Sequence, residues 1–342
     1  MQQLLAAGLL DPNDASFLGG LQSGVFPPVV NDGTACPQLP MPFYAAPGSA
    51  FGSHHSYPGG LPIHESNNES SDIELAGQYR SVYLHKDEGV VALNPEAVRG
   101  RPVTHASILI DQDIIVGAPI WHDWAKPIVF QWNADGSEFH ELNIGGNGIT
   151  DNNGAAGNSK TGGHHILSIA ESMARGLSPA FVITQASAHS NPSLGNEYKV
   201  VNWIRAAAII DGIDPVATGY LMTDAKGNPR LPALRDLGDI DLANIDLANL
   251  GQTNLLAEYQ LHNLSDADFT YSIPAIGETQ IILETLAPRY GYDPTNVSVY
   301  NNNYRNPVLS FLTGERFLIL YSQQGLAGVQ GELDRLRRAH VI

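Results

Sequence analysis

The segment Ile120-Trp121-His122-Asp123-Trp124-Ala125-Lys126 closes a mostly apolar stretch that begins at Val103. Residues 103–121 are therefore expected to form a buried α-helix. Neighbouring side chains on a helix diverge by about 100°, so His122 and Asp123 can bind one metal ion together only near the end of that helix. Lys126 follows one turn later and is expected to point toward the same cavity.

A second histidine-rich segment lies upstream and reads His54-His55-Ser56-Tyr57-Pro58-Gly59-Gly60-Leu61-Pro62-Ile63-His64. Together with the His122-Asp123 pair and Lys126, this segment resembles the HD-domain superfamily of metal-dependent phosphohydrolases. The resemblance covers about residues 50–215. Pro62 and an insertion over residues 127–162 depart from the family pattern, and we expect the insertion to shape the pocket entrance and the substrate preference.

The resemblance implies a first metal ion bound by His64, His122, Asp123 and a later aspartate. Asp211 matches that last position best, because it ends a helical stretch that begins near residue 198. Asp214 is the alternative.

A second metal ion is implied by two further histidine segments, with Asp123 as the bridging carboxylate. One ligand comes from the pair His164-His165, and another is His189. His165 is preferred because its apolar neighbours follow the family pattern, but His164 matches nearly as well. Nitrogen and carboxylate ligands suit divalent Fe, Mn, Zn or Mg, and the resemblance implies two such ions.

The expected function is hydrolysis of a small phosphomonoester or phosphodiester by a metal-activated water. The expected catalytic residues are Asp123 and Lys126, and the lysine would stabilise negative charge that develops during the reaction or help protonate the leaving group. The candidate substrate-binding residues are His54, His55 and Arg205. For Arg205, an ion pair with Glu197 is the plainer interpretation.

Two alternatives stay open at the level of sequence. A branch of HD proteins uses a similar ligand set for a mixed-valent di-iron centre, which cleaves a C–C or C–P bond with oxygen. A non-catalytic, metal-stabilised binding protein is the other alternative. Lys126 and the glycines near the inserted loop would be dispensable in such a protein, which favours an enzyme.

The expected fold is mainly α, with one HD-type helical core over residues 51–220. An irregular arm, 1–50, precedes it, and an irregular extension, 221–342, packs on it. Within the insertion, residues 128–132 and 139–144 are expected to pair as a β-hairpin around a turn at 133–136. Core helices are predicted over 163–175, 178–190 and 198–211. In the extension we predict a strand within 255–271 and helices over 279–286 and 326–340.

Composition narrows the possible partners. The chain of 342 residues has 18 basic and 35 acidic residues, a net charge of −17, which opposes binding to nucleic acid or anionic lipid through a basic surface. No apolar run approaches the roughly 20 residues of a membrane span. Cys36 is the single cysteine, so an intramolecular disulfide is excluded. The amino terminus lacks the features of a signal peptide, and the compartment and oligomeric state are left open.

Overall fold

The structure is a computed structural model that describes residues 2–10, 42–50, 52–83, 110–130, 132–137, 141, 143–146, 159–192, 196–224, 227–232 and 257–342. Most of the predicted arm, including Cys36, lies outside these ranges. So do the first part of the helix predicted over 103–121 and the centre of the inserted loop. The statements below concern the described residues.

The described residues confirm a mainly α fold, and they form two compact units that interleave along the chain. The first unit takes its residues from 1–20, 67–125 and 142–266, and the second from 21–66, 126–141 and 267–342. The predicted core, 51–220, therefore contributes to both units. The long helix α3 (Gly60–Tyr83) begins in the second unit and ends in the first.

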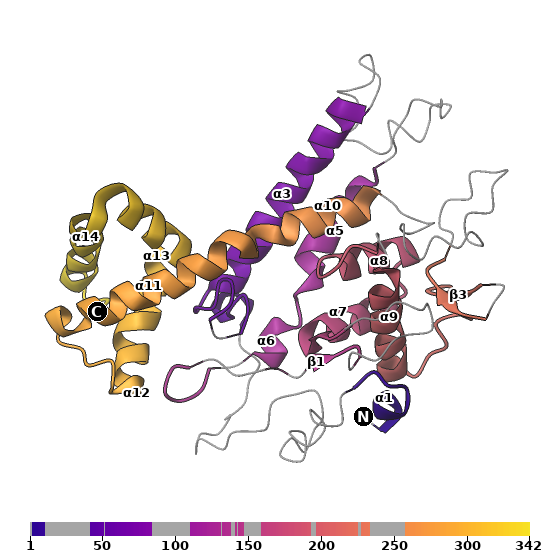
Figure 1. Ribbon diagram of the computed structural model, residues 1–342, viewed down its shortest axis with the longest axis horizontal. Coiled ribbons are helices and arrows are strands. Elements are labelled where there is room, and N and C mark those ends of the chain that lie inside the picture. The colour runs from indigo at the N-terminus through magenta and orange to yellow at the C-terminus, as the bar shows by residue number, and fades with distance from the viewer. Residues whose placement is uncertain are drawn as a thin grey trace. The chain divides into compact units, whose positions relative to one another are not determined.

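The first unit is built on helices that neighbour one another along the chain and in space. Figure 1 shows α7, α8 and α9 grouped beside α5, and α7 packs against α9 and α8. Besides α3, the elements are α1 (Gln2–Ala6), α5 (Gln112–His122), β1 (Asn143–Ile144), β2 (Thr161–Gly162), α7 (Gly163–Ala174), α8 (Pro179–Ser187), α9 (Glu197–Asp211), β3 (Met222–Thr223), β4 (Pro229–Arg230) and α10 (Ala257–Ser265).

The second unit is dominated by α11, which packs along α14. Its core joins Tyr57 from the histidine-rich segment to apolar residues of α11, α13 and α14, including Ile276, Val308 and Phe317. The elements are η2 (Phe43–Ala45), the start of α3, α6 (Lys126–Val129), α11 (Phe269–Tyr290), α12 (Val297–Tyr300), the π-helix η5 (Asn301–Arg305), α13 (Asn306–Leu312) and α14 (Gly314–Arg338). A 3₁₀ turn, η4 (Asp266–Asp268), stands where the chain passes from the first unit to the second.

The core helices confirm the predicted ranges to within a few residues. Ser178 caps α8 by accepting a hydrogen bond from the Phe181 backbone N–H at 3.2 Å, and Pro179 occupies the first turn, where its missing N–H costs nothing. Gly212 ends α9 in the left-handed conformation at φ 69°. Among the described residues, no helix combines the length and apolarity that a membrane crossing requires.

The strand pairing in the insertion differs from the predicted hairpin. Residues 126–129 are helical, and β1 pairs antiparallel with β2 across the insertion instead of with 128–132. Pro127 fixes a helical φ near the start of α6, which explains the helix. The predicted turn does form, because the Asn133 N–H donates to the Ser137 carbonyl at 2.7 Å. It packs against α13 within the second unit, where Asn306 donates to the Gly136 carbonyl at 2.8 Å.

The carboxyl-terminal third is more regular than predicted, and the strand expected within 255–271 is wrong. Tyr259 and Leu261 alternate with polar residues, which suits a strand. The buried side chains nevertheless include Glu258, His262 and Ser265, and this set repeats at helical spacing. Tertiary packing of that face therefore selects the helix α10.

A buried polar network holds the beginning of α5 between α3 and α10. Arg80 of α3 donates to the Ile110 carbonyl at 3.2 Å, and the Asp111 N–H donates to Glu258 of α10 at 2.7 Å. Asp72 lies in the same region at 0% exposure, and no described residue hydrogen-bonds its carboxylate. Burial, with repulsion from Glu258, raises the pKa of Asp72 to about 8.

The substitution Asp72→Asn is expected to stabilise the protein at neutral and alkaline pH. Because the pKa of Asp72 is higher in the folded than in the unfolded chain, folding retains a proton, and the free energy of unfolding falls as pH rises from about 4 to about 8. Asparagine removes that titration and should raise the free energy of unfolding at pH 7 by roughly 2–4 kcal/mol. Denaturant unfolding across pH 5 to 9 measures it.

Glu74→Gln, at an exposed position of the same helix, is the matched control and should leave the pH dependence unchanged. If the Asp72→Asn protein is less stable than the parent at every pH, the ionised Asp72 carboxylate does not destabilise the folded chain and the prediction is wrong.

Candidate metal centre

Helix α5 ends at His122, as the sequence predicts, and this ending determines how the His122-Asp123 pair is presented. Asp111 caps the helix start by accepting hydrogen bonds from the backbone N–H groups of Asp113 and Ile114 at 3.0 and 3.4 Å. At the other end, the His122 Nδ1 lies 2.6 Å from the Pro119 carbonyl oxygen. A donor at Nδ1 satisfies that carbonyl and leaves Nε2 as the metal-binding atom.

Asp123 lies between two histidines from different helices. His122 Nε2 is 3.3 Å from Asp123 Oδ2, and His164 Nε2 is 3.1 Å from Asp123 Oδ1. His122 and Asp123 are both 0% exposed, and His164 is 5% exposed. Both oxygens of one buried carboxylate therefore face an imidazole nitrogen, as a bridging ligand requires.

His189, just beyond the end of α8, joins this cluster. Its Nδ1 lies 2.7 Å from the Thr161 hydroxyl, so its Nε2 is available to a metal. Ligand atoms of Asp123, His164 and His189 all lie within 4.8 Å of one another. The residue is itself exposed, unlike its partners, and it places the cluster at the edge of the first unit's buried interior.

Asp266 supplies the second carboxylate of the first unit. Its Oδ1 lies 3.3 Å from His122 Nε2, and ligand atoms of His122, His189 and Asp266 form another set within 4.8 Å. The first unit thus gathers five donors that could hold metal ions: His122, Asp123, His164, His189 and Asp266. All are nitrogen or carboxylate ligands of borderline-to-hard character.

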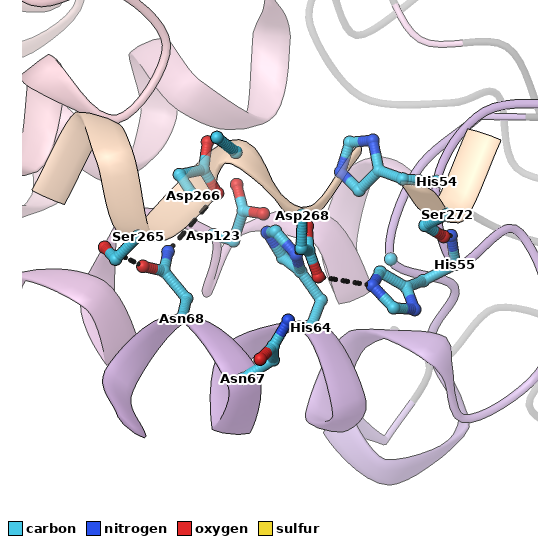
Figure 2. A network of polar contacts seen from close by, with 12 residues as sticks. His54, His55, His64, Asn67, Asn68, Asp123, Ser265, Asp266, Asp268 and Ser272 are labelled. Atoms are coloured by element: carbon cyan, nitrogen blue, oxygen red, sulfur yellow. Dashed lines mark hydrogen bonds and ion pairs between the residues drawn. The ribbon is translucent and has the colours of Figure 1, made fainter. Parts of the chain in front are cut away.

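A polar network behind Asp266 fixes its carboxylate. Asn68 of α3 donates to Asp266 Oδ1 at 3.2 Å, and the Ser265 hydroxyl donates to the Asn68 side-chain oxygen (Figure 2). The remaining partner is His262, whose Nε2 lies 3.5 Å from the Asn68 amide and whose Nδ1 lies 2.7 Å from the Thr184 carbonyl. Burial lowers the pKa of His262 to about 3, which keeps this imidazole neutral as the network requires.

His165 is placed differently from His164. Its ring stacks on that of His189, with centroids 3.9 Å apart and planes 8° apart, and Trp203 packs edge-on against it at 5.0 Å. His165 is 0% exposed, and neither ring nitrogen hydrogen-bonds to a described residue. Burial lowers the pKa of His165 well below its usual value. Of the two adjacent histidines, His164 is the one that faces Asp123.

Substituting His165 separates stacking from ligation. If His165 only supports His189, His165→Phe keeps the flat surface and should retain metal affinity within about threefold, whereas His165→Ala should lower it about tenfold and cost roughly 2–4 kcal/mol of stability. Competition with a chromogenic chelator measures the affinity. Loss of metal in both variants, with native circular dichroism, would instead make His165 a ligand, as the sequence prefers.

The loop before α7 is held by Trp203 of α9. The Trp203 indole N–H donates to the Ser159 carbonyl at 2.6 Å, and the Ser159 hydroxyl donates to the Gly145 carbonyl. Gly145 adopts φ 115°, and a Cβ there would lie 2.3 Å from the Ser159 oxygen. Gly145, at the edge of the inserted loop, is thus packed tightly against α9, the helix that carries Trp203.

In the second unit, His55 and His64 gather around Asp268. His55 Nε2 is 2.6 Å from Asp268 Oδ2, and His64 Nδ1 is 3.4 Å from Asp268 Oδ1. Burial opposes a charge on His55, but Asp268 and Glu315 outweigh it and raise the pKa of His55. The same contacts overcome burial at the acids: they lower the pKa of Asp268 well below its usual range and that of Glu315 to about 2.

Each of the other predicted site residues has contacts with described neighbours. Lys126, in the second unit, is buried and its amine donates to the Gly48 carbonyl. His54 lies beside His64, with ring centroids 4.9 Å apart. Arg205 donates to the Asn202 side chain at 2.9 Å, while Glu197 pairs with Arg230 at 2.8 Å. The catalytic and substrate-binding roles of these residues stay predictions.

Asp211, the aspartate preferred from the sequence, belongs to none of the histidine–carboxylate groups formed by described residues. It ends α9, and burial with repulsion from Glu171 raises its pKa to about 6. The residues that sequence reasoning missed are Asn68, Asp266, Asp268 and Glu315. Assigning α10 as a strand concealed Asp266, because a strand would not deliver an aspartate at its end to the histidines.

No family model, no curated protein and no solved structure matches this chain. The functional interpretation therefore rests on the histidine and aspartate groups that could hold a metal ion.

Proposed function

We propose that the chain is an HD-type metal-dependent phosphohydrolase that hydrolyses a small phosphomonoester or phosphodiester. The observation that carries the proposal is Asp123, whose two buried oxygens lie 3.1 and 3.3 Å from imidazole nitrogens of His164 and His122. A carboxylate in that position suits two divalent ions held side by side. The HD-type sequence motif supports the same arrangement.

The donor set fits divalent ions chemically. Two carboxylates and three imidazoles carry a charge of about −2 when the imidazoles are neutral, and buried charge of this kind is normally paired or bound to metal. His122 and His189 each have Nδ1 engaged, by the Pro119 carbonyl and the Thr161 hydroxyl. These outer contacts fix the tautomer that a metal ligand needs.

Bound divalent ions would supply a hydroxide at neutral pH and neutralise charge on phosphoryl oxygens. The protein's own part is to hold that site rigid and largely buried. Asn68 and Ser265 restrain Asp266, and His165 supports the ring of His189. A donor atom displaced by about 1 Å would cost much of the rate, so this support is part of the proposed activity.

The charge of the chain favours a small substrate. A net charge of −17 repels a polynucleotide, which would contact the protein over a long surface. A single phosphoryl group would instead interact mainly with the bound metal ions. A phosphorylated small molecule is therefore the proposed substrate class.

The test is a hydrolysis assay on phosphomonoesters and phosphodiesters, with protein reconstituted separately with Mn²⁺, Zn²⁺, Mg²⁺ and Fe²⁺, in air and under argon. We expect phosphate release that is independent of oxygen and is abolished by His122→Ala. Turnover that requires both iron and oxygen would replace hydrolysis with C–C or C–P bond cleavage. A folded protein that binds no metal would contradict both reactions.

A further inference from the structure

We propose that His55, His64 and Asp268, all within the second unit, bind a divalent cation. Ligand atoms of the three residues all lie within 4.8 Å of one another. His55 and His64 are buried at 3% and 1% exposure. The inference goes beyond the proposed hydrolysis, because it makes His55 and Asp268, which that proposal does not use, ligands of a metal ion, and it holds whatever reaction the protein catalyses.

The spacing of the donors suits a single ion. Metal–ligand bonds of about 2.0–2.2 Å place neighbouring donor atoms about 3–3.5 Å apart. Asp268 Oδ2 and Oδ1 lie 2.6 and 3.4 Å from nitrogens of His55 and His64, respectively, so small rotations of these side chains open the space that an ion needs. In Figure 2 the imidazole of His55 points directly at the Asp268 carboxylate.

The surroundings of His55 are those of a metal-binding histidine. Its Nδ1 lies 3.1 Å from Glu315 Oε1 and 3.0 Å from the Tyr57 hydroxyl. Glu315 is held in turn, because Tyr57 donates to its Oε2 at 2.9 Å and Ser272 donates to its Oε1. A carboxylate that accepts the Nδ1 proton fixes the tautomer whose Nε2 binds metal, and Nε2 is the atom that faces Asp268.

The backbone is shaped to hold His55 at this point. His55 has φ 48°, a conformation that costs energy for a residue with a side chain, and its N–H donates to the Ser272 hydroxyl at 2.9 Å. A Cβ on Gly60 would lie 1.9 Å from the His55 carbonyl oxygen, and one on Gly48 would lie 2.5 Å from the His55 Cβ. Two glycines and one strained residue thus deliver a single imidazole to Asp268 and Glu315.

Charge favours a divalent ion at this group. The side chains of Asp268 and Glu315 are only 13% and 16% exposed, so two negative charges are largely withdrawn from water beside two imidazoles. Two nitrogens and one carboxylate, with room for water, suit Zn²⁺ or Mn²⁺ rather than Ca²⁺.

Zinc stoichiometry tests the proposal with the full chain. After loading with Zn²⁺ and desalting, Asp268→Asn should hold one zinc fewer per chain than the parent protein. Glu315→Gln should weaken that same zinc 10- to 100-fold in a chelator competition, because the outer carboxylate is lost. Glu332→Gln, also within α14 but beyond its break at Gly325 and paired with Arg335 at the surface, is the matched control and should change neither value. Equal zinc content in parent and folded Asp268→Asn overturns the proposal.

Anomalous scattering gives a second test that needs no substitution. Crystals of the parent protein soaked in Zn²⁺ should show a zinc peak bonded to His55 Nε2, His64 and Asp268. A direct His55–Asp268 hydrogen bond without a peak, in a crystal with zinc at Asp123 and His164, overturns the proposal. Because both tests read metal position or count, a protein without phosphatase activity leaves this inference standing.

Discussion

Replacing Asp123 with asparagine is expected to remove bound metal and to lower kcat/KM for phosphoester hydrolysis by at least about 10³-fold, which corresponds to roughly 4 kcal/mol of transition-state stabilisation. Both oxygens of Asp123 face imidazole nitrogens, at 3.1 and 3.3 Å. An asparagine offers one uncharged oxygen and an N–H₂ group that cannot bind a cation. Metal content by elemental analysis and steady-state kinetics measure the two effects.

The control for Asp123 is Asp113→Asn, because Asp113 is exposed and lies in the first turn of the same helix. That variant should keep metal content and activity within about twofold of the parent protein. If Asp123→Asn retains its metal and hydrolyses substrate within tenfold of the parent, Asp123 is not the bridging carboxylate and the proposed function is wrong.

The second large effect is a contrast between two aspartates. Asp266→Asn should reduce metal affinity and activity by at least about 10²-fold, since its Oδ1 lies 3.3 Å from His122 Nε2 and is bound by Asn68. Asp211→Asn should leave both within about twofold, because Asp211 belongs to none of the histidine–carboxylate groups formed by described residues. Its raised pKa comes from burial and from repulsion by Glu171. The same metal-content and kinetic measurements apply to both variants.

This contrast tests whether the aspartate ligand is Asp211, which the sequence motif favours, or Asp266, which the structure favours. Both substitutions are isosteric and remove one charge, so each is the control of the other. A loss confined to Asp211→Asn would return the role to the aspartate that the sequence motif favours. Equal losses in both would show that stability, rather than ligation, is being measured, and thermal unfolding of the two apo proteins distinguishes that case.

Local patterns were sufficient for much of the fold. The ends of α5, α8 and α9 follow from a capping aspartate, a first-turn proline and a terminal glycine, all of which act within a few residues. The position of His122 and Asp123 at the end of α5 is a consequence of the same local rules. The sequence also singled out His122, Asp123 and His164 as candidates, because adjacent His-Asp and His-His pairs stand out in a chain with few charged residues.

Long-range contacts explain what the sequence could not provide. Asn68 and Asp266 are 198 positions apart, and His55 and Asp268 are 213 apart, so nothing in either segment marks its partner. The choice between His164 and His165 depends on which side of α7 faces α5, and adjacent residues on a helix differ there by about 100°. The pairing of β1 with β2 similarly depends on where the turn at 133–137 packs.

The indole of Trp203 gives this protein a built-in optical reporter. Its ring stands edge-on to His165 at 5.0 Å, and His165 stacks on His189, so two aromatic contacts connect the fluorophore to the edge of the metal cluster. The other three tryptophans, at positions 121, 124 and 132, also emit, and two of them flank His122 and Asp123, so comparison with Trp203→Phe isolates the signal of Trp203. Fluorescence can therefore follow metal binding in rapid mixing, without a label and without a substrate.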